Sequence, residues 1–244
     1  MEPGSTRTRQ PGIVRISSVT PTLAFDVYGT LIDTDGITGA LKPLVGEHAA
    51  EFARHWREKQ LEYSFRRGLM QQYKEFSVCV RESLDYVCLA LGKELTDVQR
   101  QSLLDCYRTL PAFPDVKGGL ELAKQAGFRL YAFSNGSTGA VTGLLEQAGI
   151  RDYFIDVVSV DEIKTFKPDP AVYCHFLKRT AASAESAWLI SGNPFDCIGA
   201  LSVGMRAAWV QRRPEVVFDP WGLPPTLTIT SLGEMAHAIS NASK

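Results

Sequence analysis

The stretch TLAFDVYGTLID, residues 22–33, decides the fold of this chain. An apolar run over residues 23–25 is long enough for a buried strand, and it ends at Asp26. Turn-forming residues around Gly29 and Thr30 follow it. Ligands of open α/β sheets bind beyond the carboxyl ends of the strands, so we expect Asp26 to face a crevice, where a carboxylate can act as a nucleophile. The alternative is an ordinary turn at the end of a strand, where Asp and Gly are also common.

The composition is that of a globular protein with no strong charge imbalance. The chain has 244 residues, of which 45% are hydrophobic and 22% charged, and its net charge is −1. This balance argues against nucleic-acid binding, and no apolar run approaches the length of a membrane span. Residues 1–16 are predicted to be a disordered tail and not a secretory signal, because no apolar core follows their polar start. The five cysteines form no C-x-x-C pair, which favours reduced thiols and a cytoplasmic protein.

Residues 34–111 are predicted to form a helical domain inserted into the rest of the fold. Apolar residues recur at three- and four-residue steps between residues 52 and 63, and again between residues 76 and 91. Gly92 is predicted to end a helix, and Thr96 to cap the next one. We interpret the insertion as a cap domain that acts as a lid.

From residue 112 onward, helical and strand patterns alternate. Helices are predicted over residues 116–125, 139–148 and 232–239, from Pro170, and before residue 207, and strands over residues 130–133, 155–159, 187–190, 207–210 and 227–229. This alternation predicts a parallel, doubly wound sheet in an α/β fold. The core domain is therefore predicted to comprise residues 17–33 and 112–244.

Polar residues follow three of the predicted strands. They are Asp26 after the first strand, Ser134-Asn135 after the second, and the cluster from Ser191 to Asp196 after the fourth. Lys167 lies in a predicted loop at the same edge. Because the carboxyl ends of parallel strands share one edge, these side chains are expected to gather beneath the cap.

With these four clusters, the chain resembles the haloacid dehalogenase (HAD) superfamily. The segment FDVYGTL that begins at Phe25 is similar to its first motif, and Ser134-Asn135-Gly136 to its second. Lys167 in FKPDP is similar to the third motif, and SGNPFD at residues 191–196 to the fourth. The resemblance runs from about Leu23 to the C-terminus, and it implies a Rossmann-like core with an inserted helical cap domain.

Two features distinguish this chain from the phosphatases of the superfamily. Phosphatases carry a second aspartate, their general acid, where Tyr28 stands here, and they usually offer a magnesium-binding carboxylate near the position of Asn193. The octapeptide WREKQLEY at residues 56–63 resembles the cap helix of the L-2-haloacid dehalogenases. That resemblance places Arg57 at the family's halide-contacting arginine, although an arginine on a helix is most often simply solvated.

The resemblance implies a metal-independent hydrolysis without a cofactor. Asp26 would attack C2 of a short L-2-haloalkanoic acid, expel the halide and form an ester, which water would hydrolyse to the 2-hydroxy acid with inversion at C2. Lys167 would keep Asp26 ionised, with Thr30 donating to it and Tyr173 orienting the lysine.

Further residues are expected to bind the substrate or the water. Ser134 and the backbone N–H groups after Asp26, from Val27 onward, would bind the substrate carboxylate. Arg57 and Asn135 would stabilise the halide as its charge develops. The remaining candidates are Ser191, Asn193 and Asp196, for positioning water, and Tyr28 and Phe195, as pocket walls; Ser, Asn and Asp are also common helix caps.

Several alternatives remain open at this level. A haloacetate or fluoroacetate dehalogenase, a Mg²⁺-dependent HAD phosphatase of a small metabolite and a non-catalytic binding protein on the same fold are all compatible with parts of the pattern. The predicted partners are a halocarboxylate, water and the product halide, with no nucleic acid and no membrane. A homodimer is left open, and so are the physiological substrate and the halogen.

Overall fold

The apolar run after Pro21 forms the strand β1 (Thr22–Phe25), and all four of its residues are buried. In the computed structural model, which describes residues 20–242, β1 pairs in parallel with β2 (Arg129–Ser134) and with β4 (Ala187–Ser191). The other strands complete a parallel sheet in the order β3-β2-β1-β4-β5-β6, where β3 is Asp156–Ser159, β5 is Arg206–Val210 and β6 is Leu227–Ile229. The predicted tail, residues 1–16, lies outside the described residues.

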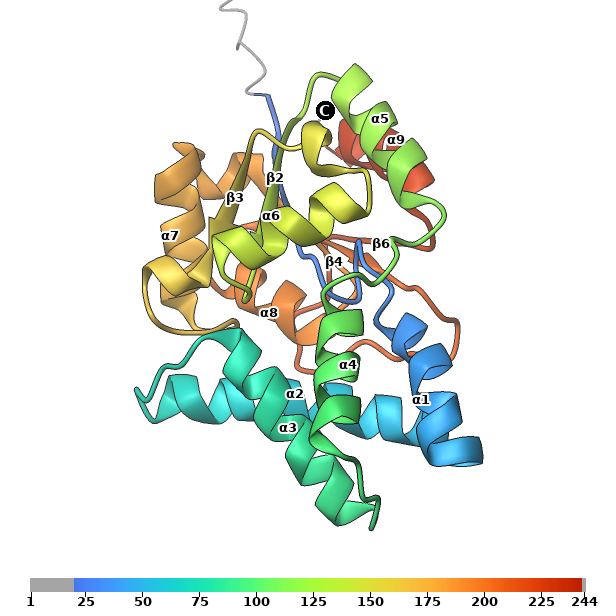
Figure 1. Cartoon of the computed structure of the whole chain (residues 1–244). Helices are drawn as coiled ribbons and strands as arrows, with labels where there is room; N and C mark the ends of the chain where they lie inside the picture. Colours follow the sequence, from blue (N-terminus) through green and yellow to red (C-terminus); the bar gives the residue numbers. More distant parts are fainter. Residues whose placement is uncertain (1–19, 243–244) are drawn as a thin grey trace, which may run out of the picture.

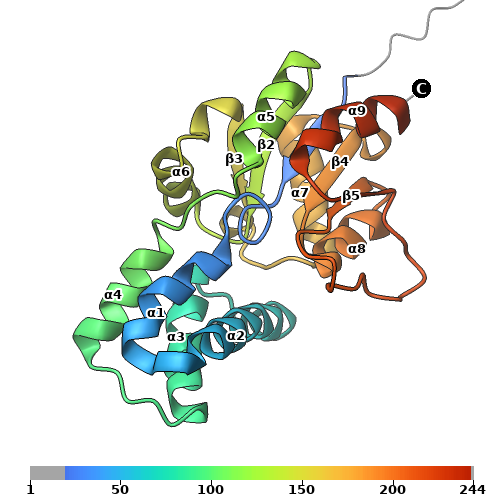
Figure 2. The ribbon, with the colours of Figure 1, turned by 90° about the vertical axis from the view of Figure 1, so that its right-hand side faces the viewer.

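Helices cover both faces of this sheet, which confirms the predicted doubly wound α/β fold (Figure 2). One face carries α5 (Val116–Gln125), α6 (Thr138–Gln147) and α9 (Leu232–Ala242), and the opposite face carries α7 (Pro170–Thr180) and α8 (Pro194–Ser202). The chain runs outward from β1 in one direction through β2 and β3, and in the other through β4, β5 and β6. The crevice at such a reversal of strand order is the usual binding site of this architecture.

The insertion after β1 is helical throughout, as predicted, and lies below the sheet in Figure 1. Its longer helices are α1 (Thr38–Val45), α2 (Ala49–Leu69), α3 (Phe76–Ala90) and α4 (Asp97–Tyr107). Thr96 caps α4 as expected, in a capping box with Gln99.

Two chain segments join this helical layer to the sheet, and they pair with each other. The Asp33 N–H donates to the Pro111 carbonyl at 2.9 Å, and the Phe113 N–H donates to the Leu31 carbonyl at 3.0 Å. The two segments that connect the core with the helical layer therefore run side by side. The domain boundaries predicted at residues 33/34 and 111/112 fall at this pairing and stay an interpretation.

The helical layer rests directly on the carboxyl edge of the sheet. Phe65 of α2 packs edge-on against Phe195 of α8, with ring centroids 5.0 Å apart. The Tyr73 hydroxyl donates at 2.8 Å to Asp161, which follows the carboxyl end of β3. These contacts hold the cap against the segments that follow β4 and β3.

Within residues 20–242, no helix combines the length with the apolar character that crossing a membrane would require. All five cysteines are free thiols.

Candidate active site

Asp26 lies at the first position after β1, buried at the centre of the sheet edge. Its backbone N–H continues the sheet by donating to the Ile190 carbonyl at 3.0 Å. The carboxylate oxygen Oδ2 accepts from Thr30 Oγ1 at 2.7 Å, Asn193 Nδ2 at 2.7 Å and Ser191 Oγ at 3.4 Å. Within the described residues, Oδ1 accepts only from Lys167 Nζ, at 3.1 Å. One oxygen therefore accepts from three side chains, and the other from the ammonium group of Lys167.

The loops after β1 and β4 hold this carboxylate because they approach each other closely. Thr30 Oγ1 accepts from the Gly192 N–H at 2.8 Å while it donates to Asp26. A Cβ atom at Gly192 would lie 2.5 Å from the Gly29 carbonyl oxygen, so only glycine permits this contact. Asn193 stands at the N-cap position of α8 but makes no capping bond, because its side chain is turned to Asp26.

Lys167 supplies the positive charge next to Asp26 and is only 1% exposed. Its ammonium group donates to Asp26, to Asp196 Oδ2 at 2.8 Å and to the Phe133 carbonyl at 2.9 Å, so each of its three N–H bonds has a partner. Burial by itself would lower the pKa of Lys167, but the carboxylates of Asp196 and Asp26 outweigh it and raise that pKa above its usual value.

Asp196 is fully buried in the first turn of α8 and completes the charge cluster. Its Oδ1 accepts from the Tyr173 hydroxyl at 2.7 Å and its Oδ2 from Lys167. Burial raises the pKa of Asp196, although Lys167 opposes this. Tyr173 and Lys167 are therefore both hydrogen-bonded to Asp196, and the predicted role of Tyr173 in orienting Lys167 stays a prediction. A Cβ at Gly199 would overlap the Tyr173 hydroxyl, so a glycine one turn along α8 makes the approach possible.

Several donors beside Asp26 have no partner within residues 20–242. The N–H groups of Val27 and Tyr28 donate to no protein atom there, and the Val27 side chain is buried in the core. Ser134 Oγ accepts from the Gly136 N–H at 3.1 Å, which leaves its own hydroxyl proton unused. Asn135 is held by its Oδ1, which accepts from the Lys167 N–H at 3.0 Å, and its Nδ2 is unpaired among these residues. Such donors suit an anion.

The cap helix α2 contributes Arg57, which reaches the loop that carries the carboxylate. Its Nη2 donates to the Tyr28 carbonyl at 3.2 Å. The same carbonyl accepts from Asn193 Nδ2 at 3.1 Å. The cap arginine and the amide that touches Asp26 therefore meet at one backbone oxygen.

Aromatic rings surround this point. Tyr28 stacks on Tyr107 of α4 with ring centroids 5.8 Å apart, and it lies 5.9 Å from Phe76 of α3. Phe195 lies on the other side of the site against Phe65. Tyr28 thus places an aromatic ring at the position where the phosphatases of the superfamily carry their second aspartate.

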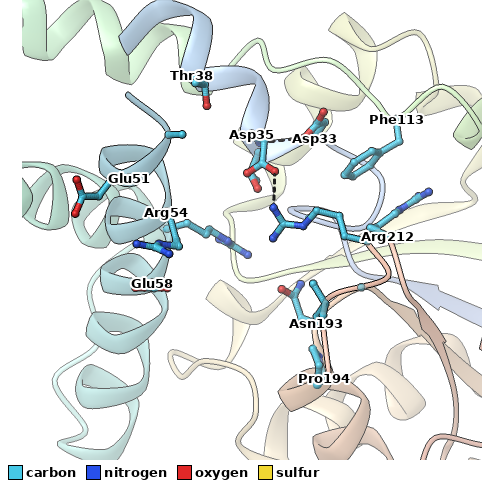
Figure 3. Close-up of a pocket in the computed structure, with 17 residues that line it drawn as sticks. Asp33, Asp35, Thr38, Glu51, Arg54, Glu58, Phe113, Asn193, Pro194 and Arg212 are labelled. Atoms are coloured by element: carbon cyan, nitrogen blue, oxygen red, sulfur yellow. Dashed lines mark hydrogen bonds and ion pairs between the residues drawn. The ribbon is translucent and has the colours of Figure 1, made fainter. Parts of the chain in front are cut away.

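A cavity of about 740 Å³ opens between cap and core beside this cluster (Figure 3). Arg54 and Glu58 of α2 line one side, and Asn193, Pro194 and Arg212 line the other. A smaller cavity of about 200 Å³ lies on the far side of the Tyr28 ring, between α3, α4 and α6. The volume of the larger cavity lies in the range that is usual for small-molecule sites.

The donor set around Asp26 fits a bound cation poorly. Its two oxygens already face an ammonium group, an amide and hydroxyls. Within the part of the chain that the structure describes, no three His, Cys, Asp or Glu side chains are grouped to hold a metal ion. Magnesium prefers several carboxylate or water oxygens, and this site offers it no second carboxylate free of hydrogen bonds.

The structure brings the predicted site residues together at one edge, and it adds residues that sequence reasoning missed. Gln60 and Tyr107 contact Arg57 or its partners, and the Phe133 carbonyl binds Lys167. Gln60 could have been found from its position three residues after Arg57 on one helix. Tyr107 lies 47 positions from its hydrogen-bond partner Gln60, and nothing in the sequence indicates that pairing.

Many known proteins are similar to this chain. A model of the haloacid dehalogenase-like hydrolases matches residues 20–204. The (S)-2-haloacid dehalogenase of Pseudomonas sp. (strain YL) is 32% identical over 91% of this chain and 95% of its own length. The haloacetate dehalogenase H-2 of Moraxella sp. (strain B) is 32% identical over 89% of this chain and 97% of its own. The structure of the L-2-haloacid dehalogenase of Xanthobacter autotrophicus with chloropropionic acid covalently bound superimposes with a TM-score of 0.82, at 26% identity over 91% of this chain and 99% of that one.

Proposed function

Since the chain belongs to the haloacid dehalogenase-like hydrolases, we propose that Asp26 is the nucleophile with which it breaks a carbon–halogen bond. The chain is a hydrolase acting on carbon–halide bonds, and it converts a short L-2-haloalkanoic acid to the 2-hydroxy acid through an ester intermediate. One observation carries the assignment of Asp26. A cap arginine meets the loop of a buried carboxylate whose charge a buried lysine balances.

In the first step, Oδ1 of Asp26 attacks C2 of the substrate. Oδ1 is the reactive oxygen because Oδ2 is already held by Thr30, Ser191 and Asn193. A carbon–oxygen bond forms as the carbon–halogen bond breaks, and the halide leaves with the bonding electrons. In-line displacement at C2 inverts its configuration, and the product of this step is an ester of Asp26.

The substrate carboxylate needs donors on the same side as Asp26. We assign this task to the free N–H groups of Val27 and Tyr28 and to the Ser134 hydroxyl. Fixing the carboxylate there sets the direction from which Oδ1 approaches C2.

The departing halide gains negative charge as the bond breaks. The Arg57 guanidinium and the free Nδ2 of Asn135 are the donors assigned to it, and Phe195 and Tyr28 form the walls that exclude water. Donors that are already in place when charge develops lower the barrier most effectively.

In the second step, water attacks Cγ of the ester, and the bond between Cγ and the alkyl oxygen breaks. The hydroxy acid leaves and one water oxygen remains on Asp26. The predicted role of Asp196 in positioning this water stays a prediction; its oxygens accept from Tyr173 and Lys167. The raised pKa of Asp196 favours it as the acceptor of the proton that water gives up, with Ser191 and Asn193 beside it.

A specific observation favours a second candidate substrate. A haloacetate dehalogenase is as similar to this chain as the haloacid dehalogenase is. Haloacetate has no substituent on C2 other than the halogen, so it needs no pocket for a side chain. We rank it second, and fluoroacetate with it.

Halide release by EDTA-treated enzyme tests both candidates. L-2-chloropropionate, its D-enantiomer, chloroacetate and fluoroacetate are compared, with Asp26→Asn as the inactive control. We expect chloride from the L-enantiomer and none from the D-enantiomer. Absence of halide from every substrate, together with Mg²⁺-dependent phosphate release from phosphate esters, would overturn the proposal.

A single turnover in ¹⁸O-labelled water tests the intermediate. Mass spectrometry of the peptide containing Asp26 is expected to find the heavy oxygen on that residue. Label that goes directly into the product would reject the ester.

Location and assembly remain proposals. We infer a cytoplasmic protein from the five free thiols, and a homodimer stays open for measurement by light scattering.

A further inference from the structure

Gln60 is a fully buried glutamine on α2, one helical turn after Arg57. Its Oε1 accepts from the Tyr107 hydroxyl at 2.8 Å and lies 3.5 Å from Arg57 Nη1. Arg57 in turn donates to the Tyr28 carbonyl. Gln60 is therefore the buried acceptor behind the arginine that faces the nucleophile loop.

The hydrogen-bond network determines which way the Gln60 amide points. A guanidinium can only donate, so the side facing Arg57 must be Oε1 and not the NH₂ group. With Oε1 in that place, Nε2 is buried without a partner in the described structure. An unpaired buried donor costs stability, so nothing in the packing of the core calls for a glutamine here.

The ring of Tyr107 ties this amide to the reacting loop. Tyr107 stacks on Tyr28 and packs 5.4 Å from Trp56, which precedes Arg57. Trp56 is itself fixed, because its Nε1 donates to the Val80 carbonyl at 2.9 Å. Gln60 thus contacts the Nη1 side of the Arg57 guanidinium, Tyr107 and Trp56 pack behind Gln60, and Nη2 donates to the Tyr28 carbonyl.

We propose that Gln60 is a positioning residue that, with Tyr107, holds the Arg57 guanidinium where the halide departs. This inference rests on the proposed dehalogenase function and deepens it. Without the Oε1 acceptor, the guanidinium retains its charge and its hydrogen bond to the Tyr28 carbonyl, but it loses the acceptor at Nη1. The halide would then leave with less stabilisation, while substrate binding through Ser134 and the backbone would be unchanged.

The leaving group provides a test that a purely structural role would not satisfy. The carbon–chlorine bond is stronger than the carbon–bromine bond, so its cleavage depends more on stabilisation of the departing halide. Loss of a well-placed Arg57 should therefore reduce turnover of L-2-chloropropionate more than that of L-2-bromopropionate. A variant that is merely unstable would lose both activities equally.

Gln60→Met keeps the length and removes the acceptor. We expect kcat/KM for the chloro acid to fall by about 10- to 100-fold, mainly in kcat, and the bromide-to-chloride ratio of kcat/KM to rise severalfold. Gln72→Met, an exposed glutamine of the same cap, is the matched control and should match the parent. Equal losses with both halogens, or no loss, would overturn the inference.

Two further variants keep the test decisive if Gln60→Met does not fold. Tyr107→Phe removes the hydroxyl that holds Oε1 and should raise the bromide-to-chloride ratio to a smaller extent. Gln60→Glu keeps the acceptor but sets a negative charge against Arg57, so its ratio should be high at alkaline pH and return toward the parent value as acid protonates the introduced carboxyl. A ratio equal to the parent's in both variants would reject the role. Absence of halide from the parent enzyme would instead reject the proposed function, and this inference with it.

Discussion

Lys167 is the residue on which the charge balance of the site depends. It is 1% exposed, and its ammonium group sits between the carboxylates of Asp26 and Asp196. Buried charges of this kind are tolerated only when each is paired and hydrogen-bonded, as all three are here. The arrangement therefore stabilises the fold, and in the proposed mechanism it also sets a positive charge beside the nucleophile.

Lys167→Met should show both roles. The variant leaves two buried carboxylates without their cation, so we expect the free energy of unfolding to fall by about 3–5 kcal/mol and halide release to fall below detection. Urea unfolding followed by circular dichroism measures the first effect. Lys178→Met, at an exposed lysine of α7, should change stability by less than about 0.5 kcal/mol. A Lys167 variant as stable as this control would contradict the account.

The pH dependence follows from the raised pKa of Lys167. Its stabilising charge is fully present below the usual lysine pKa of 10.5, and it is lost as the pH rises through the higher pKa of the folded state. The difference in unfolding free energy between the parent and Lys167→Met should hence stay constant up to about that pH and shrink above it. Urea titrations in buffers that span this value measure the difference. A difference that shrinks well below 10.5 would show that the pKa is lowered.

At the scale of elements, the site is a product of helix and strand packing. Helix α8 begins at the end of β4, and it brings Asn193 and Asp196 to the edge where β1 ends. Helix α7 packs against α8 and delivers Tyr173 to Asp196. Because a Cβ at Gly199 would overlap the Tyr173 hydroxyl, the distance between these two helices is set by a glycine.

Gly199→Ala should displace Tyr173 from Asp196. The added methyl group has no room, so we expect a loss of about 1–3 kcal/mol in stability and reduced halide release. Gly143→Ala on α6 is the matched control, because its Cβ would meet no atom within 4 Å. That change should instead stabilise the protein, by up to about 1 kcal/mol, through helix propensity. Thermal unfolding measures the stability of both variants. If Gly199→Ala changes stability no more than Gly143→Ala does, α7 and α8 can move apart to admit the methyl group.

At the scale of the whole molecule, the proposed active site lies between the cap and the core. The cap supplies Arg57 and Gln60, and the core supplies Asp26, Lys167 and Asn193. Two cavities lie near this site, and Tyr28 lines the smaller one. The larger one is bounded by Arg57 and Asn193, which both touch the nucleophile loop.

We predict that substrates enter through the larger cavity. Ala50→Trp fills part of its wall on α2 and should lower kcat/KM by at least about tenfold, which corresponds to 1.4 kcal/mol, with a larger effect on longer 2-bromo acids. Ala140→Trp places the same bulk in the smaller cavity and should leave kcat/KM close to that of the parent. Steady-state kinetics with substrates of increasing chain length compares them. A loss of kcat/KM in Ala140→Trp but not in Ala50→Trp would assign substrate entry to the smaller cavity.

Local patterns in the sequence predicted most of the elements and their order. The apolar run before Asp26 and the period-three-to-four spacing in residues 52–63 and 76–91 correspond to β1, α2 and α3. Such patterns are reliable because burial of a strand or of one helix face leaves a regular trace in the chain. The gathering of Asp26, Ser134 and Ser191 at one edge was also predictable, since parallel strands share their carboxyl edge.

The contacts between distant segments could not be predicted in the same way. Examples are the hydrogen bond of Tyr107 to Gln60, the meeting of Arg57 and Asn193 at the Tyr28 carbonyl, and the hydrogen bond of Tyr173 to Asp196. Each joins side chains far apart in the chain, and none changes the local periodicity. The roles assigned to the predicted site residues accordingly stay predictions until the variants are measured.

The amino-acid sequence alone predicted a doubly wound α/β fold with an inserted helical cap and a carboxylate at the end of its first strand, and its motifs indicated a hydrolase through their resemblance to a known family. Strand order, periodicity and motif spacing are local properties that the chain carries before it folds. Only the tertiary structure decided which donors each oxygen of Asp26 accepts from and which groups contact Lys167 and Arg57. Those choices depend on distances between side chains that the fold alone brings within a few ångströms, in an interior where an unpaired charge or donor is costly.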